Sequence, residues 1–109
     1  MTSRRLFALA GIALGASIAT AAQAEGDADA GRYKSQTCLG CHGIPGYTNV
    51  YPTYHVPKLG GQNAEYIVSA LQAYQDGLRP HPTMQSQATP LSSEDMQDIA
   101  AYFTSIEPR

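Results

Sequence analysis

The chain has 109 residues, a formal net charge of −2 and two cysteines. A chain of this length forms one domain, and it has no patch of lysine and arginine of the kind that binds nucleic acid or anionic membranes. We therefore expect no nucleic-acid partner, and we expect a covalent link or a cofactor to supplement the small hydrophobic core.

Residues 1–24 have the layout of a secretory signal peptide. Two arginines precede the uncharged residues 6–20, and the sequence AQA at residues 22–24 matches the small-x-small pattern that signal peptidase cleaves. The uncharged stretch is short for a membrane span, although an uncleaved anchor is the alternative. We predict cleavage after Ala24, which leaves residues 25–109 as a periplasmic domain without a membrane span. Five basic and nine acidic residues then give that domain a net charge of −4.

The first of three predicted helices begins at Asp27 or Asp29, either of which can cap it, and runs towards Thr37. Gly31 lies inside this helix, where glycine costs about 1 kcal/mol relative to alanine. We therefore expect another backbone to approach the helix closely at Gly31.

The second predicted helix begins near Asn63, a good N-cap residue, and stops at Gly77, the expected position of a C-terminal glycine. Its apolar residues repeat at helical spacing. This stripe consists of Ile67, Ala70, Leu71 and Tyr74.

The third predicted helix begins after Ser92, and Asp95 three residues later can complete a capping box. It ends near Ile106. Its apolar stripe consists of Met96, Ile99, Ala100 and Phe103.

The connections at residues 43–62 and 78–90 are long and rich in Gly, Pro and Tyr, and no strand alternation is predicted in them. Structureless connections of this length are uncommon in a compact domain unless they wrap or bind something. A large apolar ligand would account both for them and for the small core.

Cys38 and Cys41 are the only cysteines, and His42 follows directly. A thioredoxin-like dithiol needs βαβ surroundings, of which there is no sign. A structural zinc site needs four ligands, and His55 and His81 lie at the wrong spacings. A disulfide across so short a loop would stabilise the fold only slightly.

C-x-x-C-H is the attachment signature of a c-type haem. In a helical turn the two cysteines share one face and can reach the two vinyl groups of a porphyrin. His42 can then place its imidazole under the iron. We therefore predict one haem c per chain, bound covalently through Cys38 and Cys41.

The sequence resembles the class I cytochromes c, in particular the small soluble bacterial ones with a single haem. The likeness covers the mature chain and is carried by the AG pair at 30–31, CLGCHG at 38–43, PKLGGQ at 57–62, a loop methionine and LSSEDMQDIAAYF at 91–103. The resemblance implies an all-α cytochrome c fold, with three main short helices and long loops wrapped around the haem.

The resemblance also implies the iron ligands, His42 and Met84. Met84 lies in the loop where the family keeps its distal methionine, and a thioether ligand favours the ferrous state and raises the reduction potential. Met96 is assigned to packing. His81 is an alternative ligand, but we expect a solvated loop residue, and His55 is a weaker alternative.

In the family, the carbonyl of the residue matching Pro57 accepts the Nδ1–H of the proximal histidine, which orients the imidazole. The family's first and last helices cross at the glycine matching Gly31, and Tyr102 or Ala101 would be its neighbour here. Relatives often carry an aromatic residue where this chain has Ser35, and Tyr33 is a candidate replacement.

An iron with both axial positions filled has no open site for substrate. We therefore expect a periplasmic one-electron carrier, not an enzyme, which cycles between Fe(II) and Fe(III) and docks transiently, as a monomer, to larger redox proteins. The net charge predicts mildly basic partners and association that slows with salt. The alternatives are a haem enzyme or a gas- or peroxide-binding sensor with an open sixth position, and a dedicated cytochrome subunit of a dehydrogenase.

The residue that contacts the haem propionates is left open among Tyr47, Tyr51, Tyr54 and Arg79.

Overall fold

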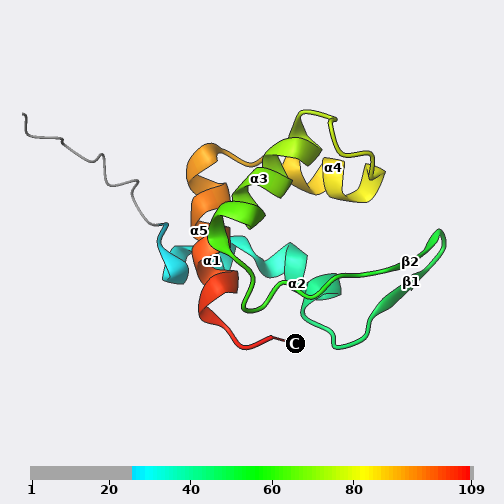
Figure 1. Cartoon of the computed structure of the whole chain (residues 1–109), viewed down its shortest axis with the longest axis horizontal. Coiled ribbons are helices and arrows are strands. Elements are labelled where there is room, and N and C mark those ends of the chain that lie inside the picture. Colours follow the sequence, from blue (N-terminus) through cyan, green and yellow to red (C-terminus); the bar gives the residue numbers. More distant parts are fainter. Residues whose placement is uncertain (1–25, 109) are drawn as a thin grey trace, which may run out of the picture.

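The computed structural model describes residues 26–108, and the predicted signal peptide lies outside them. Figure 1 shows the helices gathered on one side and a hairpin arm extending away from them. In chain order the elements are α1 (Ala28–Lys34), α2 (Gln36–His42), β1 (Thr48–Val50), β2 (Thr53–His55), α3 (Ala64–Gln75), α4 (Pro82–Ala88) and α5 (Ser93–Ser105).

The closest helix packing is between α1 and α5. Gly31 is buried, and a Cβ atom added to it would collide with the carbonyl oxygen of Asp98 and lie 2.9 Å from Tyr102 Cβ. The close approach predicted at Gly31 is therefore confirmed, with Tyr102 as the side-chain neighbour. The backbone of Asp98, not Ala101, is the other partner.

Polar contacts hold the same crossing. Lys34 Nζ lies 2.8 Å from Asp95 Oδ1 and 2.6 Å from Asp98 Oδ2, and the N–H of Asp27 donates to Asp98 Oδ1 at 2.7 Å. The contact with Lys34 and the backbone of Ser92 lower the pKa of Asp95 to about 2. The contacts with Lys34 and the Asp27 backbone lower the pKa of Asp98, and the two carboxylates raise the pKa of Lys34.

The hydrophobic core lies between α3, α4 and α5. It is built on the stripes predicted for the second and third helices, of which Leu71 and Phe103 are examples. The capping box of Ser92 and Asp95 is present, and the Asn63 side chain accepts from the N–H of Tyr66. The buried hydrophobic residues of this core are Ile67, Leu71, Ala88, Met96, Ile99, Ala100 and Phe103.

The prediction of long connections without strands is wrong for residues 48–55. β1 and β2 pair antiparallel, with Thr48 opposite His55 and Val50 opposite Thr53. Each strand has three residues with the burial pattern exposed, intermediate, exposed. Alternation over three residues is too short to separate from chance, so only the pairing reveals the hairpin.

Two helices were not predicted as separate elements, α2 and α4. The first predicted helix stops at Lys34, and Ser35 is both the C-cap of α1 and the N-cap of α2. Ser35 is fully buried, whereas Tyr33 is 76% exposed. The prediction that Tyr33 packs in place of the missing aromatic residue is therefore wrong.

Candidate haem-binding site

Helix α2 presents the three residues of the CXXCH motif. Cys38 and Cys41 are free thiols, three residues apart and half-buried, and His42 is the last residue of the helix. Burial raises the pKa of the Cys38 thiol, so this group is uncharged in its surroundings. The helix therefore offers two thiols and one imidazole from a single short segment.

The connection after the hairpin fixes the His42 ring. Nδ1 of His42 lies 2.8 Å from the carbonyl oxygen of Pro57, the pair of atoms that the resemblance implies. Because a carbonyl can only accept, Nδ1 carries the proton, and the lone pair of Nε2 is left available to a metal.

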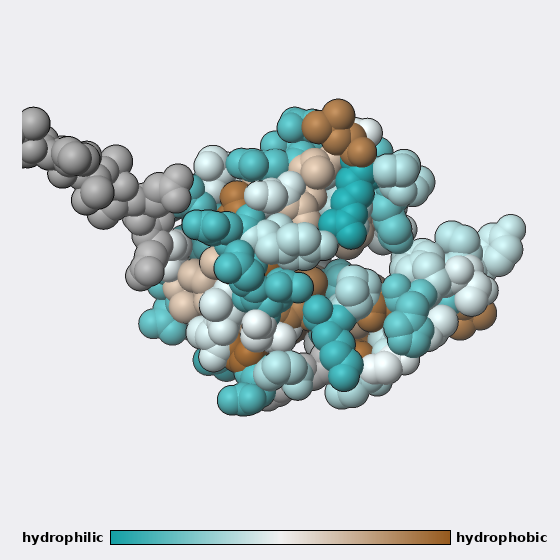
Figure 2. All heavy atoms as spheres, in the orientation of Figure 1, coloured by the Kyte–Doolittle hydropathy of each residue, from teal (hydrophilic) through white to brown (hydrophobic). Residues whose placement is uncertain are grey.

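A cavity of about 220 Å³ lies against the same histidine. Its apolar lining comes from Leu39, Tyr102 and Ile106, and its other lining residues are His42, Gly43 and Gly60. Figure 2 shows a further hollow between the α4 side and the hairpin side of the molecule, whereas the lining of this cavity includes no residue of α4 or of the hairpin. Of the predicted site residues, only His42 lines this cavity. Two thiols and a free imidazole nitrogen on one short helix fit a porphyrin with covalent attachment.

Met84 is the third residue of α4, and its half-buried side chain packs against the core. Its backbone N–H donates to Nδ1 of His81 at 3.3 Å, so His81 is the N-cap of the helix, with Pro82 at the first position. The His81 ring packs edge to face on Tyr54 and Tyr74, with centroids 4.8 Å and 6.2 Å away. The expectation that His81 is a solvated loop residue is therefore wrong.

The other end of α4 is held by Gln75, which sequence reasoning missed. Its side-chain Nε2 donates to the carbonyl oxygens of Ala88, Thr89 and Leu91 at 3.1, 3.2 and 2.9 Å. The hydroxyl of Tyr54 on β2 lies 3.4 Å from Thr83 Oγ1 of α4. Helix α4 is thus positioned by side chains from β2 and α3, whose sequence separation from it leaves no local signal.

The other sulfur and the other histidine do not join this site. Met96 is 1% exposed in the core, which confirms its assignment to packing. His55 is exposed on β2, and its Nδ1 lies 3.1 Å from Thr48 Oγ1. Among the candidates for propionate contact, Tyr51 is 94% exposed and Arg79 lies 4.8 Å from the centroid of the Tyr74 ring. The propionate contact stays a prediction.

Comparisons with known proteins give one family. The family model of cytochrome c matches residues 24–107. Cytochrome c-554(548) of Halomonas halodenitrificans is 46% identical over 85 residues, which are 75% of this chain and 99% of that protein. Cytochrome c4 of Pseudomonas aeruginosa is 42% identical over 84 residues, 77% of this chain and 40% of that protein.

A solved structure agrees with the family. The crystal structure of reduced recombinant cytochrome c4 from Pseudomonas stutzeri superposes with a TM-score of 0.52 at 30% identity, over 64% of this chain and 38% of that one. The chain thus spans nearly all of the first relative but about two fifths of each cytochrome c4. The chain therefore belongs to the cytochrome c family: it is an electron-carrying protein with a covalently bound haem c, and Cys38 and Cys41 fit the CXXCH motif that attaches it.

Proposed function

We propose that the protein is a one-electron carrier whose haem iron is held between His42 and Met84. The hydrogen bond from His42 Nδ1 to the Pro57 carbonyl is the observation that carries this proposal. It holds the imidazole in one tautomer and one orientation, and it increases the electron donation of Nε2. The bound haem supplies the one-electron change between Fe(II) and Fe(III).

Met84 is proposed as the second ligand because of where α4 holds it. Its side chain is half-buried and its helix is held at the N-terminus by His81 and at the C-terminus by Gln75. The rival sulfur, Met96, is buried in the core. The Nδ1 atom of the rival histidine, His81, already accepts the N–H of Met84.

A pair of protein ligands leaves no position for a substrate or a small gas at the iron. We therefore propose a carrier, neither an enzyme nor a sensor. A thioether ligand favours the ferrous state, so the reduction potential should exceed that of a haem with two histidine ligands. His42 and Met84 would hold the iron in both oxidation states, and the haem would supply the uptake and release of one electron.

We also propose that the carrier works in the periplasm as a monomer. The layout of residues 1–24 and the cleavage expected after Ala24 support export, with 25–109 as the mature domain. In the part of the chain that the structure describes, every helix is too short or too polar to cross a membrane.

The optical spectrum of the purified haem protein tests the ligands. The ferric protein should show a weak sulfur-to-iron charge-transfer band towards the red, and the ferrous protein should bind CO slowly at neutral pH. Met84→Leu should remove the band and admit CO quickly, whereas Met96→Leu, a matched change in the core, should keep the band. A wild-type protein without the band, or one that binds CO rapidly, would show an open sixth position instead.

A further inference from the structure

Charged side chains are absent from the two segments that hold the expected iron ligands. Residues 35–57, which include the CXXCH motif, contain no Asp, Glu, Lys or Arg, and neither do residues 80–93, which include Met84. Residues 26–108 nevertheless carry four basic and eight acidic side chains. Five of the acidic residues lie on α1, its N-cap and the first two turns of α5: Asp27, Asp29, Glu94, Asp95 and Asp98.

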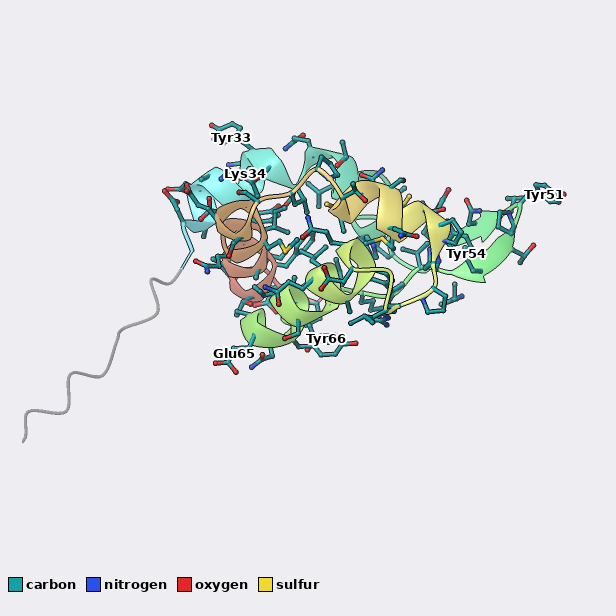
Figure 3. The ribbon with its side chains drawn as sticks, turned by 90° about the horizontal axis from the view of Figure 1, so that it is seen from above. Tyr33, Lys34, Tyr51, Tyr54, Glu65 and Tyr66 are labelled. Atoms are coloured by element: carbon teal, nitrogen blue, oxygen red, sulfur yellow. The ribbon has the colours of Figure 1, made fainter. Side chains whose placement is uncertain are left out.

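The two uncharged segments meet in space. The Tyr54 ring of β2 packs on His81, and the Tyr54 hydroxyl lies 3.4 Å from Thr83 Oγ1 of α4. Figure 3 shows Tyr51 and Tyr54 at the opposite end of the molecule from Tyr33 and Lys34. We call the surface of residues 35–57 and 80–93 the neutral face. Glu94 and Asp95 border it at Ser92, and Arg79 borders it over the Tyr74 ring that packs on His81. The other three acidic side chains of the crossing lie on or beside α1 and on α5.

The neutral face extends into an apolar tip. Val50 and Tyr51 at the turn of the hairpin are 83% and 94% exposed, and Ile44 is half-exposed. In Figure 1 this hairpin projects from the helical part. Exposed tyrosine and aliphatic side chains on an uncharged surface match the centre of a protein interface, from which charged residues are depleted.

We infer that the neutral face is the surface through which the protein exchanges electrons, and that it fits a redox protein whose own docking surface is uncharged and apolar. This inference rests on the proposed electron-carrier function. A charged surface on the partner would lose water against a face with no opposite charge to pair with it. Dissolved salt screens the fields of the acidic side chains on α1 and α5, with a Debye length of about 8 Å at physiological salt.

The inference and the net charge predict different partners. A net charge of −4 acting as a whole favours a basic partner and association that slows with salt. A neutral face makes association nearly independent of salt, because little charge is brought together in the encounter. The dependence of the association rate on ionic strength therefore distinguishes a basic partner from an uncharged one.

A second copy of the haem protein is a suitable probe, because it carries the same neutral face. In electron self-exchange one electron passes from the reduced to the oxidised copy, and no bond forms or breaks. The rate is obtained from NMR line widths of mixed reduced and oxidised protein. We expect it to change by less than about twofold between about 10 and 200 mM salt. If the whole negative charge acted, salt would screen the repulsion and raise the rate about fivefold, which would overturn the inference.

Two exposed tyrosines provide a matched pair of variants. Tyr51→Lys places a charge on the tip of each copy and removes an apolar contact, so self-exchange should slow about fivefold at low salt. Tyr33→Lys makes the same change on α1, where the tyrosine is 76% exposed. Its self-exchange rate should stay within about twofold of the wild-type rate. Tyr51→Phe should keep the wild-type rate. Equal effects of Tyr51→Lys and Tyr33→Lys would overturn the inference, and unchanged thermal unfolding would exclude a folding defect.

Two further outcomes are decisive. A stable dimer in sedimentation velocity that Tyr51→Lys dissociates would make the tip a permanent self-association surface, and so overturn the inference. Absence of any self-exchange, together with a ferric spectrum lacking the sulfur–iron band, would overturn the proposed function as well. Exchange that rises steeply with salt while the spectrum keeps that band would overturn this inference alone.

Discussion

The α1–α5 crossing and the α4–hairpin region are held together in different ways. At the crossing, backbone lies against backbone at Gly31, and ionic contacts join the two helices. Helix α4 is held instead by single side chains: His81, the residue directly before it, caps one end, and Gln75 of α3 and Tyr54 of the hairpin contact it from distant segments. The crossing therefore has little freedom to change without loss of the fold. The position of Met84 depends instead on a few contacts that can be altered one at a time.

The largest expected effect is at the crossing. Gly31→Ala puts a methyl group into the Asp98 carbonyl and against Tyr102, and neither backbone can move away easily. We expect a loss of about 3 kcal/mol in the free energy of unfolding, measured by urea denaturation of the haem protein.

The control for this change is Gly40→Ala. Gly40 also lies in a helix, but an added Cβ atom meets nothing within 4 Å. Here alanine should be neutral or stabilise the protein by up to about 1 kcal/mol through helix propensity. Equal losses for both variants would mean that the close approach at Gly31 does not limit stability.

An intermediate effect is expected at the N-terminus of α4. His81→Ala removes the cap and the aromatic contacts and should cost about 2 kcal/mol in the free energy of unfolding. It should also weaken the sulfur–iron band and lower the midpoint potential, because Met84 is the third residue of the helix that loses its cap. Urea denaturation, the ferric spectrum and voltammetry measure the three changes.

His81→Asn tests the cap by itself, because asparagine is a good N-cap residue without the ring. It should recover about 1 kcal/mol and most of the band. If His81→Ala lowers stability but leaves the band and the potential unchanged, the α4 region does not position Met84, and the contrast with the crossing disappears.

The same difference explains what could be predicted from the sequence. The helix after Ser92 is predictable because its capping box and its stripe lie within the segment itself. The CXXCH motif is predictable for the same reason. By contrast, α4 begins at the last residue of a Pro-His-Pro run, which is typical of a loop. Its cap is a histidine, which is outside the usual set of N-cap residues.

Contacts between distant segments leave no such signal. Gln75 bonds to carbonyls 13 to 16 residues further along the chain, and nothing in its neighbourhood marks it. The strands of the hairpin have three residues each and exist through their pairing. Pro57 and His42 are 15 residues apart, and only the resemblance to a family suggested that they meet.

The smallest expected effect is the response of the crossing to acid. Contacts with Lys34 lower the pKa of both Asp95, to about 2, and Asp98, so both bind protons less readily when folded than when unfolded. Stability from these carboxylates is therefore fully present above about pH 4, the unfolded pKa, and is lost as the pH falls towards 2. Lys34 has a raised pKa, so its contribution is complete below its ordinary value of 10.5 and is lost only at higher pH.

Lys34→Gln separates this network from other sources of acid sensitivity. Without the lysine, the two carboxylates regain pKa values closer to normal, and the free energy of unfolding should fall less steeply between pH 4 and 2. Part of the slope should remain, because Ser92 still donates to Asp95 and the backbone of Asp27 still donates to Asp98. Urea denaturation over this range measures both slopes. Identical slopes would mean that the ionic contacts add nothing to the crossing, and that backbone packing at Gly31 alone distinguishes it from the α4–hairpin region.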